Sequence, residues 1–154
     1  MLTFKEIVVP TDFSEHSLRA LDYAIGLAEK FGSQLELVYV IEAGLQSSDM
    51  TWTNVDYGEI TKQHREAARK HMAGIVKDRV PNGIDINISI LLGKSFVEII
   101  RFADSVNADL IVMATQGHGG LSHFLLGSTT ERVVRKAPCA VLTIKHPVPI
   151  SPMA

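Results

Sequence analysis

The sequence predicts an α/β fold in which a doubly wound, mostly parallel sheet of five strands is covered by helices on both faces. Short apolar runs rich in β-branched residues alternate with longer stretches of helical periodicity along the chain. Several runs are apolar almost without interruption, which is typical of parallel strands buried on both sides. We expect the strand order 3-2-1-4-5, which makes the first and fourth strands neighbours where the order reverses.

The first half of the chain predicts two strands, a helix and an irregular segment. Residues 7–10 are three β-branched residues and a proline, a pattern typical of a buried strand and its exit. A helix is expected over about 15–31, because apolar residues recur on one face and a glycine follows where a C-cap belongs. A second apolar strand covers 35–41. Residues 42–57 show no clear period and predict a long loop, in which Trp52 either packs on the core or covers a ligand.

The second half of the chain repeats this alternation. Isoleucines at every second position from Ile84 to Ile90 alternate with polar residues and predict a half-exposed strand near a sheet edge. Pro138 ends the last helix, because the residue before a proline disfavours the helical conformation. The expected elements are, in order, a helix over 58–79, a strand over 84–90, a helix over 95–106, a strand over Leu110–Ala114, a helix over Ser128–Lys136 and a strand over 139–145.

Composition limits the domain number, the compartment and the partners. The 154 residues suit one domain, which we assign to 1–146, with an exposed C-terminal tail over 147–154. The net charge of −2 and the lack of any basic block argue against a nucleic-acid partner. No apolar run is long enough to cross a membrane, and the start of the chain lacks a signal-peptide pattern. One cysteine, Cys139, excludes an internal disulfide, and we expect a cytoplasmic protein.

The most unusual stretch of the sequence covers residues 110–132. An apolar strand gives way to the loop Gly117-His118-Gly119-Gly120, and Gly127-Ser128 then precede a helix. Backbone N–H groups around such glycines, with the positive end of the helix dipole, form a site suited to phosphate. In a doubly wound sheet this loop faces the exit of the first strand, Pro10-Thr11-Asp12, so the topology and the local chemistry indicate the same crevice.

Simpler explanations of these residues stay open at this point. The glycines could serve a connection that needs positive φ angles and binds nothing. Ser128 could cap the last helix together with Glu131, and this cap would compete with phosphate for the hydroxyl. Asp12 could be a turn residue ahead of the N-cap candidate Ser14.

Two apparent motifs are rejected as sites. Gly93-Lys94-Ser95 is similar to the end of a P-loop, but the first glycine of that loop would fall at Ile88. Ser95 and Glu98 instead predict a capping box. The six histidines form no metal-binding pattern, so we expect no metal ligands on the protein.

Several dispersed segments share one register with a known family. The spacing Ala114-x2-Gly117-x9-Gly127-Ser128 resembles the glycine signature of the universal stress proteins, with alanine at the first position. The resemblance extends from Lys5 to about Lys145 and implies a Rossmann-like fold of the adenine nucleotide alpha hydrolase-like type. The other segments that carry it are I-V-V-P-T-D-F-S-E, G-L-S-H-F-L-L-G-S and E-R-V-V-R-K-A-P-C-A-V-L-T-I.

The resemblance also implies ATP binding, because family members with the full signature bind ATP. Alanine at position 114 adds only a methyl group to that signature, so binding is still expected; His118 lies within reach of the phosphates and carries less weight. A divalent cation, Mg²⁺ or Mn²⁺, would bridge the phosphates rather than bind to protein ligands. The implied site residues are Pro10, Thr11 and Asp12 beside the ribose and adenine, Val40 at the adenine, Met113 and Ala114 beneath the ribose, and Gly117, Gly127, Ser128 and Thr129 at the phosphates.

The family resemblance further implies a homodimer, formed when the fifth strand, Ala140–Ile144, pairs antiparallel with its copy, and protein partners that the sequence does not identify. We expect no catalytic residues and at most slow ATP hydrolysis, because the sequence has no P-loop lysine, no evident base beside Ser128 and no arginine in the glycine loop. One alternative is a nucleotide-free dimer that acts only through protein partners. Another is an enzyme, either an adenine-nucleotide hydrolase or an adenylyl transferase, although Thr11-Asp12-Phe13-Ser14 replaces the His-x-Gly-His type of loop that such transferases use.

Overall fold

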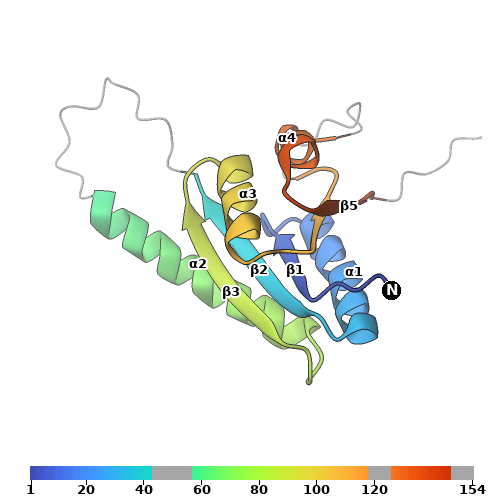
Figure 1. Ribbon diagram of the computed structural model, residues 1–154. Coiled ribbons are helices and arrows are strands. Elements are labelled where there is room, and N and C mark those ends of the chain that lie inside the picture. The colour runs from blue at the N-terminus through green and yellow to red at the C-terminus, as the bar shows by residue number, and fades with distance from the viewer. Residues whose placement is uncertain (43–56, 118–125, 147–154) are drawn as a thin grey trace, which may run out of the picture.

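The computed structural model describes residues 1–42, 57–117 and 126–146. Strands and helices alternate along these residues, as the sequence predicts (Figure 1). Their bounds are β1 Glu6–Pro10, α1 Glu15–Phe31, β2 Gln34–Ile41, α2 Tyr57–Arg79, β3 Ile86–Leu92, α3 Ser95–Ser105, β4 Leu110–Ala114, α4 Ser128–Lys136 and β5 Ala140–Ile144.

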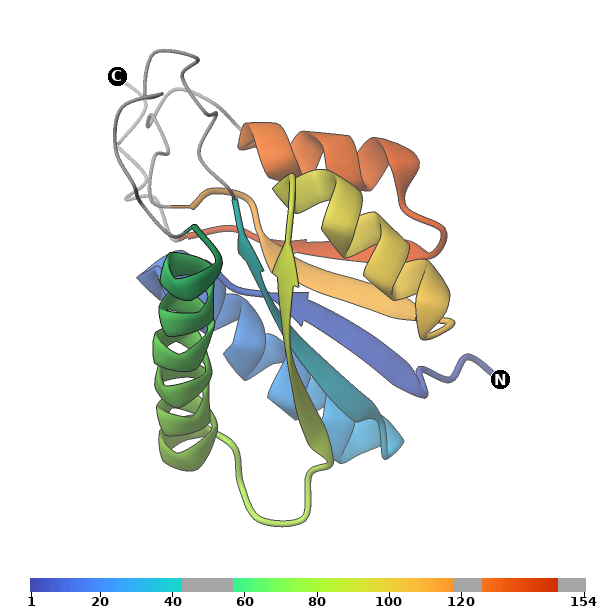
Figure 2. The ribbon, with the colours of Figure 1, turned by 90° about the vertical axis from the view of Figure 1, so that its left-hand side faces the viewer.

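The sheet has the strand order β3-β2-β1-β4-β5, and each pair of neighbours is parallel. The central strand β1 pairs with β2 on one side, where Val9 lies opposite Leu37, and with β4 on the other, where Val8 lies opposite Ile111. Helices α1 and α2 cover one face of the sheet, and α3 and α4 cover the other (Figure 2). The predicted α/β fold and the order 3-2-1-4-5 are therefore confirmed.

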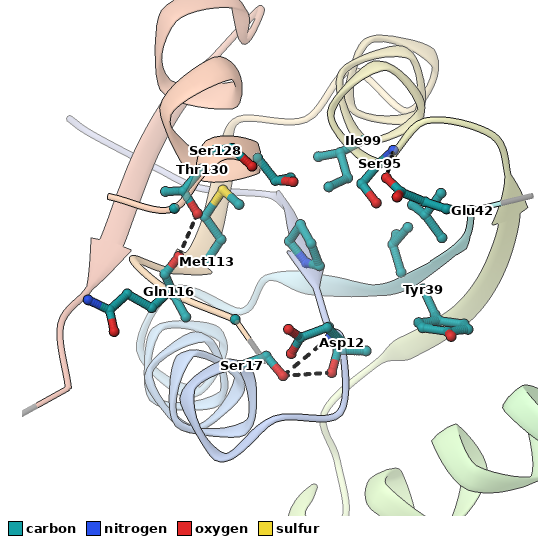
Figure 3. Close-up of a pocket in the computed structure, with 18 of the residues that line it drawn as sticks. Asp12, Ser17, Tyr39, Glu42, Ser95, Ile99, Met113, Gln116, Ser128 and Thr130 are labelled. Atoms are coloured by element: carbon teal, nitrogen blue, oxygen red, sulfur yellow. Dashed lines mark hydrogen bonds between the residues drawn. The ribbon is translucent and has the colours of Figure 1, made fainter. Parts of the chain in front are cut away.

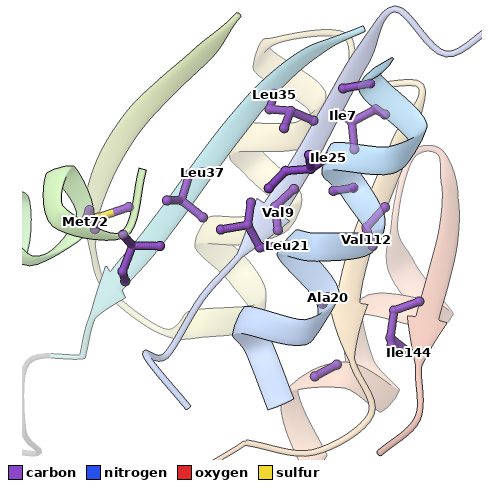
Figure 4. Close-up of a cluster of buried hydrophobic side chains, with 14 of the residues drawn as sticks. Ile7, Val9, Ala20, Leu21, Ile25, Leu35, Leu37, Met72, Val112 and Ile144 are labelled. Atoms are coloured by element: carbon purple, nitrogen blue, oxygen red, sulfur yellow. The ribbon is translucent and has the colours of Figure 1, made fainter. Parts of the chain in front are cut away.

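Each face of the sheet carries its own hydrophobic core. Successive side chains of β1 point to opposite faces, as the geometry of a strand requires. Ile7 and Val9 belong to one core with Leu21 and Ile25 of α1, and Met72 of α2 extends this core beyond Leu37 of β2 (Figure 4). Val8 packs on the other face with Val133 of α4. The side chains of Ile7, Val8, Val9, Met72 and Val133 are fully buried, so the strand ends that reach the site are held from both sides.

The third strand begins two residues later than its alternating pattern suggests. The N–H of Ile84 donates to the carbonyl of Pro81 at 3.4 Å, which keeps this residue in the preceding turn. The strand then starts at Ile86 and continues to Leu92. Its position at an edge of the sheet agrees with the prediction.

Both predicted capping boxes are wrong. Ser95 and Ser128 are the first residues of α3 and α4, and the residues before them, Lys94 and Gly127, occupy the N-cap positions. A capping side chain belongs to the residue with extended backbone that precedes the helix, and the two serines are already helical. Neither helix has a side-chain N-cap hydrogen bond, so both begin with N–H groups that need other acceptors.

Three predictions fall on residues outside the described part: the tail over 147–154, the role of Trp52 and most of its loop, and the placement of His118. Among the described residues, no helix combines the length and the apolar character needed to cross a membrane.

Candidate functional site

One cavity of about 840 Å³ opens at the carboxyl ends of β1, β2 and β4 and at the N-terminal ends of α3 and α4 (Figure 3). It lies beside the contact between β1 and β4, where the strand order reverses, as the topology predicts. The structure brings every predicted site residue to its walls, from both halves of the chain. These residues are Pro10, Thr11, Asp12, Val40, Met113, Ala114, Gly117, Gly127, Ser128 and Thr129.

The loop between β1 and α1 is fixed by its own polar groups. The N–H of Thr11 donates to Val38 of β2 at 2.8 Å, and the Thr11 hydroxyl lies 3.0 Å from that of Ser17. Asp12 Oδ1 accepts hydrogen bonds from the N–H of Ser14, at 3.0 Å, and from its hydroxyl. Ser14 is the N-cap of α1, as predicted. Asp12 therefore orders the turn and also lines the cavity, so the turn explanation and the binding explanation apply to the same side chain.

Phe13 connects this loop to α2 through a stack of rings. Its φ angle of 66° lies in the left-handed region, which a bulky side chain seldom adopts. Its ring centroid lies 4.5 Å from that of Tyr39 and 4.3 Å from that of His71, and the Tyr39 ring lies 6.3 Å from His64. The two ring contacts favour this unusual backbone conformation, which keeps Asp12 directed to the cavity.

Of two predicted glycines, Gly117 is required by space and Gly127 is not. The described positive-φ residues do not include Gly117 or Gly127, so the explanation that they serve positive φ angles is wrong for both. A Cβ atom on Gly117 would collide with Oδ2 of Asp12. A Cβ atom on Gly127 would lie 3.4 Å from the carbonyl oxygen of Thr115, to which the Gly127 N–H donates. Gly117 therefore allows the loops after β1 and β4 to approach closely, whereas a Cβ on Gly127 would make only an ordinary contact.

The first turn of α4 faces the cavity with unused donors. The N–H groups of Ser128 and Thr129 have no acceptor among the described residues. The hydroxyl of Thr130, which is buried, donates to the carbonyl of Ala114 at 2.8 Å and ties the helix to the end of β4. Because Ser128 does not serve as a cap, its hydroxyl does not compete with a ligand in the way the sequence suggests. This end of the cavity is suited to an anion.

The first turn of α3 also reaches the cavity, but its leading donor is engaged. Glu42, just after β2, accepts a hydrogen bond from the N–H of Ser95 at 2.8 Å. The hydrogen bonds from Ser95 hold the pKa of the Glu42 carboxyl below its usual range; the charge of Lys94 lowers it further, and burial opposes the shift. Glu42 is therefore a carboxylate at neutral pH.

The described lining of the cavity is acidic. It contains the carboxyl groups of Asp12, Glu42 and Glu131, together with the imidazole of His64, and it contains no lysine or arginine. No group of three His, Cys, Asp or Glu side chains suited to a metal ion occurs among the described residues. An anionic ligand here would be held by N–H groups and hydroxyls, with any further positive charge brought by the ligand itself.

Sequence reasoning missed several lining residues, among them Tyr39, Glu42, His64 and Ser95. Tyr39 and Glu42 flank the predicted Val40 at the end of a strand, so the topological argument that selected Val40 could have included them. The helix that carries His64 approaches the cavity through tertiary packing, which no local pattern indicates. Ser95 was assigned to a capping box, and this assignment hid its place at the cavity.

Comparisons with known proteins identify relatives along nearly the whole chain. The model of the universal stress protein family matches residues 3–145. Universal stress protein MJ0531 of Methanocaldococcus jannaschii is 36% identical over 148 residues, which cover 94% of this chain and 84% of that protein. A solved structure of hypothetical protein MJ0577 has a TM-score of 0.82 at 28% identity and covers 96% of this chain and 99% of its own. A crystal structure of a universal stress protein in complex with cAMP has a TM-score of 0.60 at 26% identity. This match covers 93% of the present chain and 98% of that one.

Proposed function

The chain belongs to the universal stress protein family, and from this premise we propose that it binds ATP in the cavity and acts as a regulator through nucleotide occupancy. The observation that carries the proposal is the pairing of two features at one end of the cavity. The N–H groups of Ser128 and Thr129 have no described acceptor, and Gly117 has no room for a side chain. A relative of known structure that binds cAMP supports a nucleotide ligand.

In this proposal the triphosphate lies against the first turn of α4. Gly117 and Gly127 let the phosphates approach the backbone, and Ser128 and Thr129 donate N–H and hydroxyl groups to them. The ribose and adenine extend toward the other walls. Those walls are Asp12 beside the ribose, Pro10 and Thr11 next to it, Met113 and Ala114 beneath, and the backbone of Val40 at the adenine.

The proposed cofactor includes a divalent cation, Mg²⁺ or Mn²⁺, carried by the phosphates. The described lining offers no lysine or arginine to offset their charge, and Asp12 and Glu131 add negative charge to it. A cation that bridges phosphate oxygens keeps most of its ligands as water and needs no protein cage.

We further propose that the protein is not an enzyme, or hydrolyses ATP only slowly. Phosphoryl transfer depends on positive groups that stabilise charge in the transition state and on a group that orients the attacking water. The described lining has no cationic side chain for the first task. His64 is exposed on α2, which packs on the opposite face of the sheet from α4, a poor position for the second. Unidentified protein partners in the cytoplasm would then read whether the cavity is filled.

The proposed assembly is a homodimer through β5. This strand forms an edge of the sheet, so one side of its backbone has no strand partner within the chain. Leu142 of β5 and Val134 of α4 are large apolar side chains that are 38% and 45% exposed. Antiparallel pairing of β5 with its copy would satisfy the backbone and cover these side chains.

The experiment that tests the proposal is to purify the protein without added nucleotide, denature it and identify what it releases by chromatography and mass spectrometry. Near-stoichiometric ATP or ADP is the expected result, and it should disappear from a Gly117→Val variant purified in parallel. No release, together with no change in melting temperature on addition of ATP and Mg²⁺, would instead favour the nucleotide-free dimer. Rapid turnover of ATP by the purified protein would favour a hydrolase.

A further inference from the structure

Two helix N-termini open into the cavity, and they differ in what they bind. α3 begins at Ser95 and α4 at Ser128, and Figure 3 shows the starts of these neighbouring helices on the same side of the cavity, with Asp12 across from both. The first turn of a helix offers N–H groups without partners in the helix and the positive end of the helix dipole. On these grounds alone, a phosphate group could bind at either N-terminus.

The N-terminus of α3 already holds an anion from the protein. Glu42 Oε1 accepts the hydrogen bond from the Ser95 N–H at 2.8 Å. The lowered pKa of this carboxyl agrees with a charged group in that position. By contrast, the first two N–H groups of α4, at Ser128 and Thr129, have no acceptor among the described residues.

Three cations surround an aromatic ring between α3 and α4, outside the lining of the cavity. The ring of Phe96, the second residue of α3, has the Nζ atom of Lys94 at 5.3 Å, the guanidinium carbon of Arg132 at 4.9 Å and the Nζ atom of Lys136 at 5.7 Å. Lys94 precedes α3, whereas Arg132 and Lys136 belong to α4, so these cations favour anions near both helices. Without Glu42, the first N–H group of α3 would be open to phosphate, as those of α4 are.

Other nearby carboxylates are engaged on the surfaces of their own helices. Glu98 pairs with Arg101 at 3.0 Å, and Glu131 pairs with Arg135 at 3.1 Å. Among the described residues, Glu42 is the carboxylate that reaches the first N–H of α3.

We propose that Glu42 is a positioning residue that keeps phosphate away from the N-terminus of α3 and so fixes the direction in which a nucleotide lies in the cavity. The inference rests on the proposed nucleotide binding and adds a residue that selects one of its two possible orientations. A phosphate at Ser95 would have to displace a carboxylate of the same charge. A phosphate at Ser128 meets donors without a competitor, so the base is left to the end that contains Tyr39 and Glu42.

The test uses the full chain labelled with ¹⁵N and follows backbone amide signals while inorganic pyrophosphate is added. Pyrophosphate carries charge but no base, so it reports where phosphate can bind. In the wild-type protein we expect the amides of Ser128 and Thr129 to shift and that of Ser95 to stay unchanged. In Glu42→Ala, the Ser95 amide should also shift and saturate, with an affinity at that site at least about tenfold higher than in the wild type. Glu29→Ala, on the exposed side of α1, changes the net charge equally and should behave as the wild type.

Glu42→Gln supplies a second variant, because the amide oxygen can still accept from Ser95 while the charge is lost. We expect it to admit pyrophosphate at Ser95 as well. A Ser95 shift of equal affinity in the wild type, or no Ser95 response in either variant, would overturn the role of Glu42. ATP binding itself is read separately, from the Ser128 and Thr129 amides of the wild type with ATP and Mg²⁺. A lack of response there contradicts the proposed function, while the pyrophosphate titration still decides the role of Glu42.

Discussion

Oδ2 of Asp12 occupies the space that a Cβ atom on Gly117 would need, so the loop after β1 and the loop after β4 touch at the cavity. The carboxylate is fixed from its other side, because Oδ1 accepts two hydrogen bonds from Ser14. The contact therefore has little freedom to adjust. A methyl group is enough to disturb it.

Gly117→Ala should weaken the affinity for ATP by at least about tenfold, because the Asp12 side chain must leave its position. For the same reason it should lower the free energy of unfolding by roughly 1–3 kcal/mol. Gly117→Val should have a larger effect on both. Titration calorimetry and urea unfolding measure the two quantities. The matched control is Gly74→Ala on α2, where an added Cβ meets nothing within 4 Å and should stabilise the helix by about 1 kcal/mol. Unchanged ATP affinity in both Gly117 variants would contradict the proposal that this loop binds the phosphates.

Substitutions of Asp12 should separate its two roles. Asp12→Asn retains an oxygen that can accept from Ser14, so the free energy of unfolding should change little. ATP affinity should fall by about fivefold to tenfold, because a hydrogen bond to a neutral oxygen is weaker than one to a carboxylate. Asp12→Ala should lose both the binding and about 1 kcal/mol of stability. If calorimetry finds the same ATP affinity for all three proteins, Asp12 is a turn residue only.

Glu6→Gln should stabilise the protein at neutral pH. Burial raises the pKa of the Glu6 carboxyl, and the neighbouring carboxylates of Glu36 and Asp109 raise it further. One oxygen of Glu6 is buried without a hydrogen-bond partner among the described residues, and Glu36 is 6% exposed. The folded protein therefore favours protonated Glu6. Its contribution to stability is present below the unfolded pKa, near 4.5, and is lost as the pH rises through the higher folded value.

At about pH 7 the glutamine, which can donate to Glu36, should raise the free energy of unfolding by roughly 1 kcal/mol. At about pH 4 the wild type carries the proton itself, so the gain should shrink. Urea unfolding at the two pH values measures this difference. An equal gain in the free energy of unfolding at both pH values would mean that glutamine stabilises the protein through packing and not through the loss of charge.

Leu142→Lys should convert the proposed dimer to a monomer at micromolar concentrations, because a charge on β5 would face its copy across the two-fold axis. Sedimentation velocity distinguishes the two states. Leu92→Lys is the control, since Leu92 is 42% exposed on β3 at the opposite edge of the sheet. That variant should sediment as the wild type does. A wild-type protein that is monomeric under these conditions contradicts the dimer.

The sequence predicts the strands and the position of the cavity because both depend on local patterns and on one topological rule. The apolar runs that end at Pro10 and Ala114 pair side by side in a parallel sheet, so their exits must lie together. The same reasoning could not explain why Gly117 is a glycine. Its spacing allowed a positive φ angle or a close approach, and only the position of Asp12 decides between them.

The errors at the helix starts have a similar cause. A serine three residues before a glutamate fits a capping box in sequence, but the first helical residue depends on how the preceding loop meets the sheet. At α3 the acceptor comes from Glu42, which follows β2 in a distant part of the chain. A pattern within a few residues carries no information about such a contact.

The walls of the cavity come from the loop after β1 and from the segment that joins β4 to α4, which lie far apart in the chain but side by side in the sheet. A molecule that binds both must leave before these parts can separate, so it acts as a reversible crosslink between them. Each tenfold excess of ligand over its dissociation constant then adds about 1.4 kcal/mol to the free energy of unfolding. Digestion by proteases that cleave the opened chain slows in proportion. The lifetime of the folded protein in a cell would thereby depend on the concentration of its ligand.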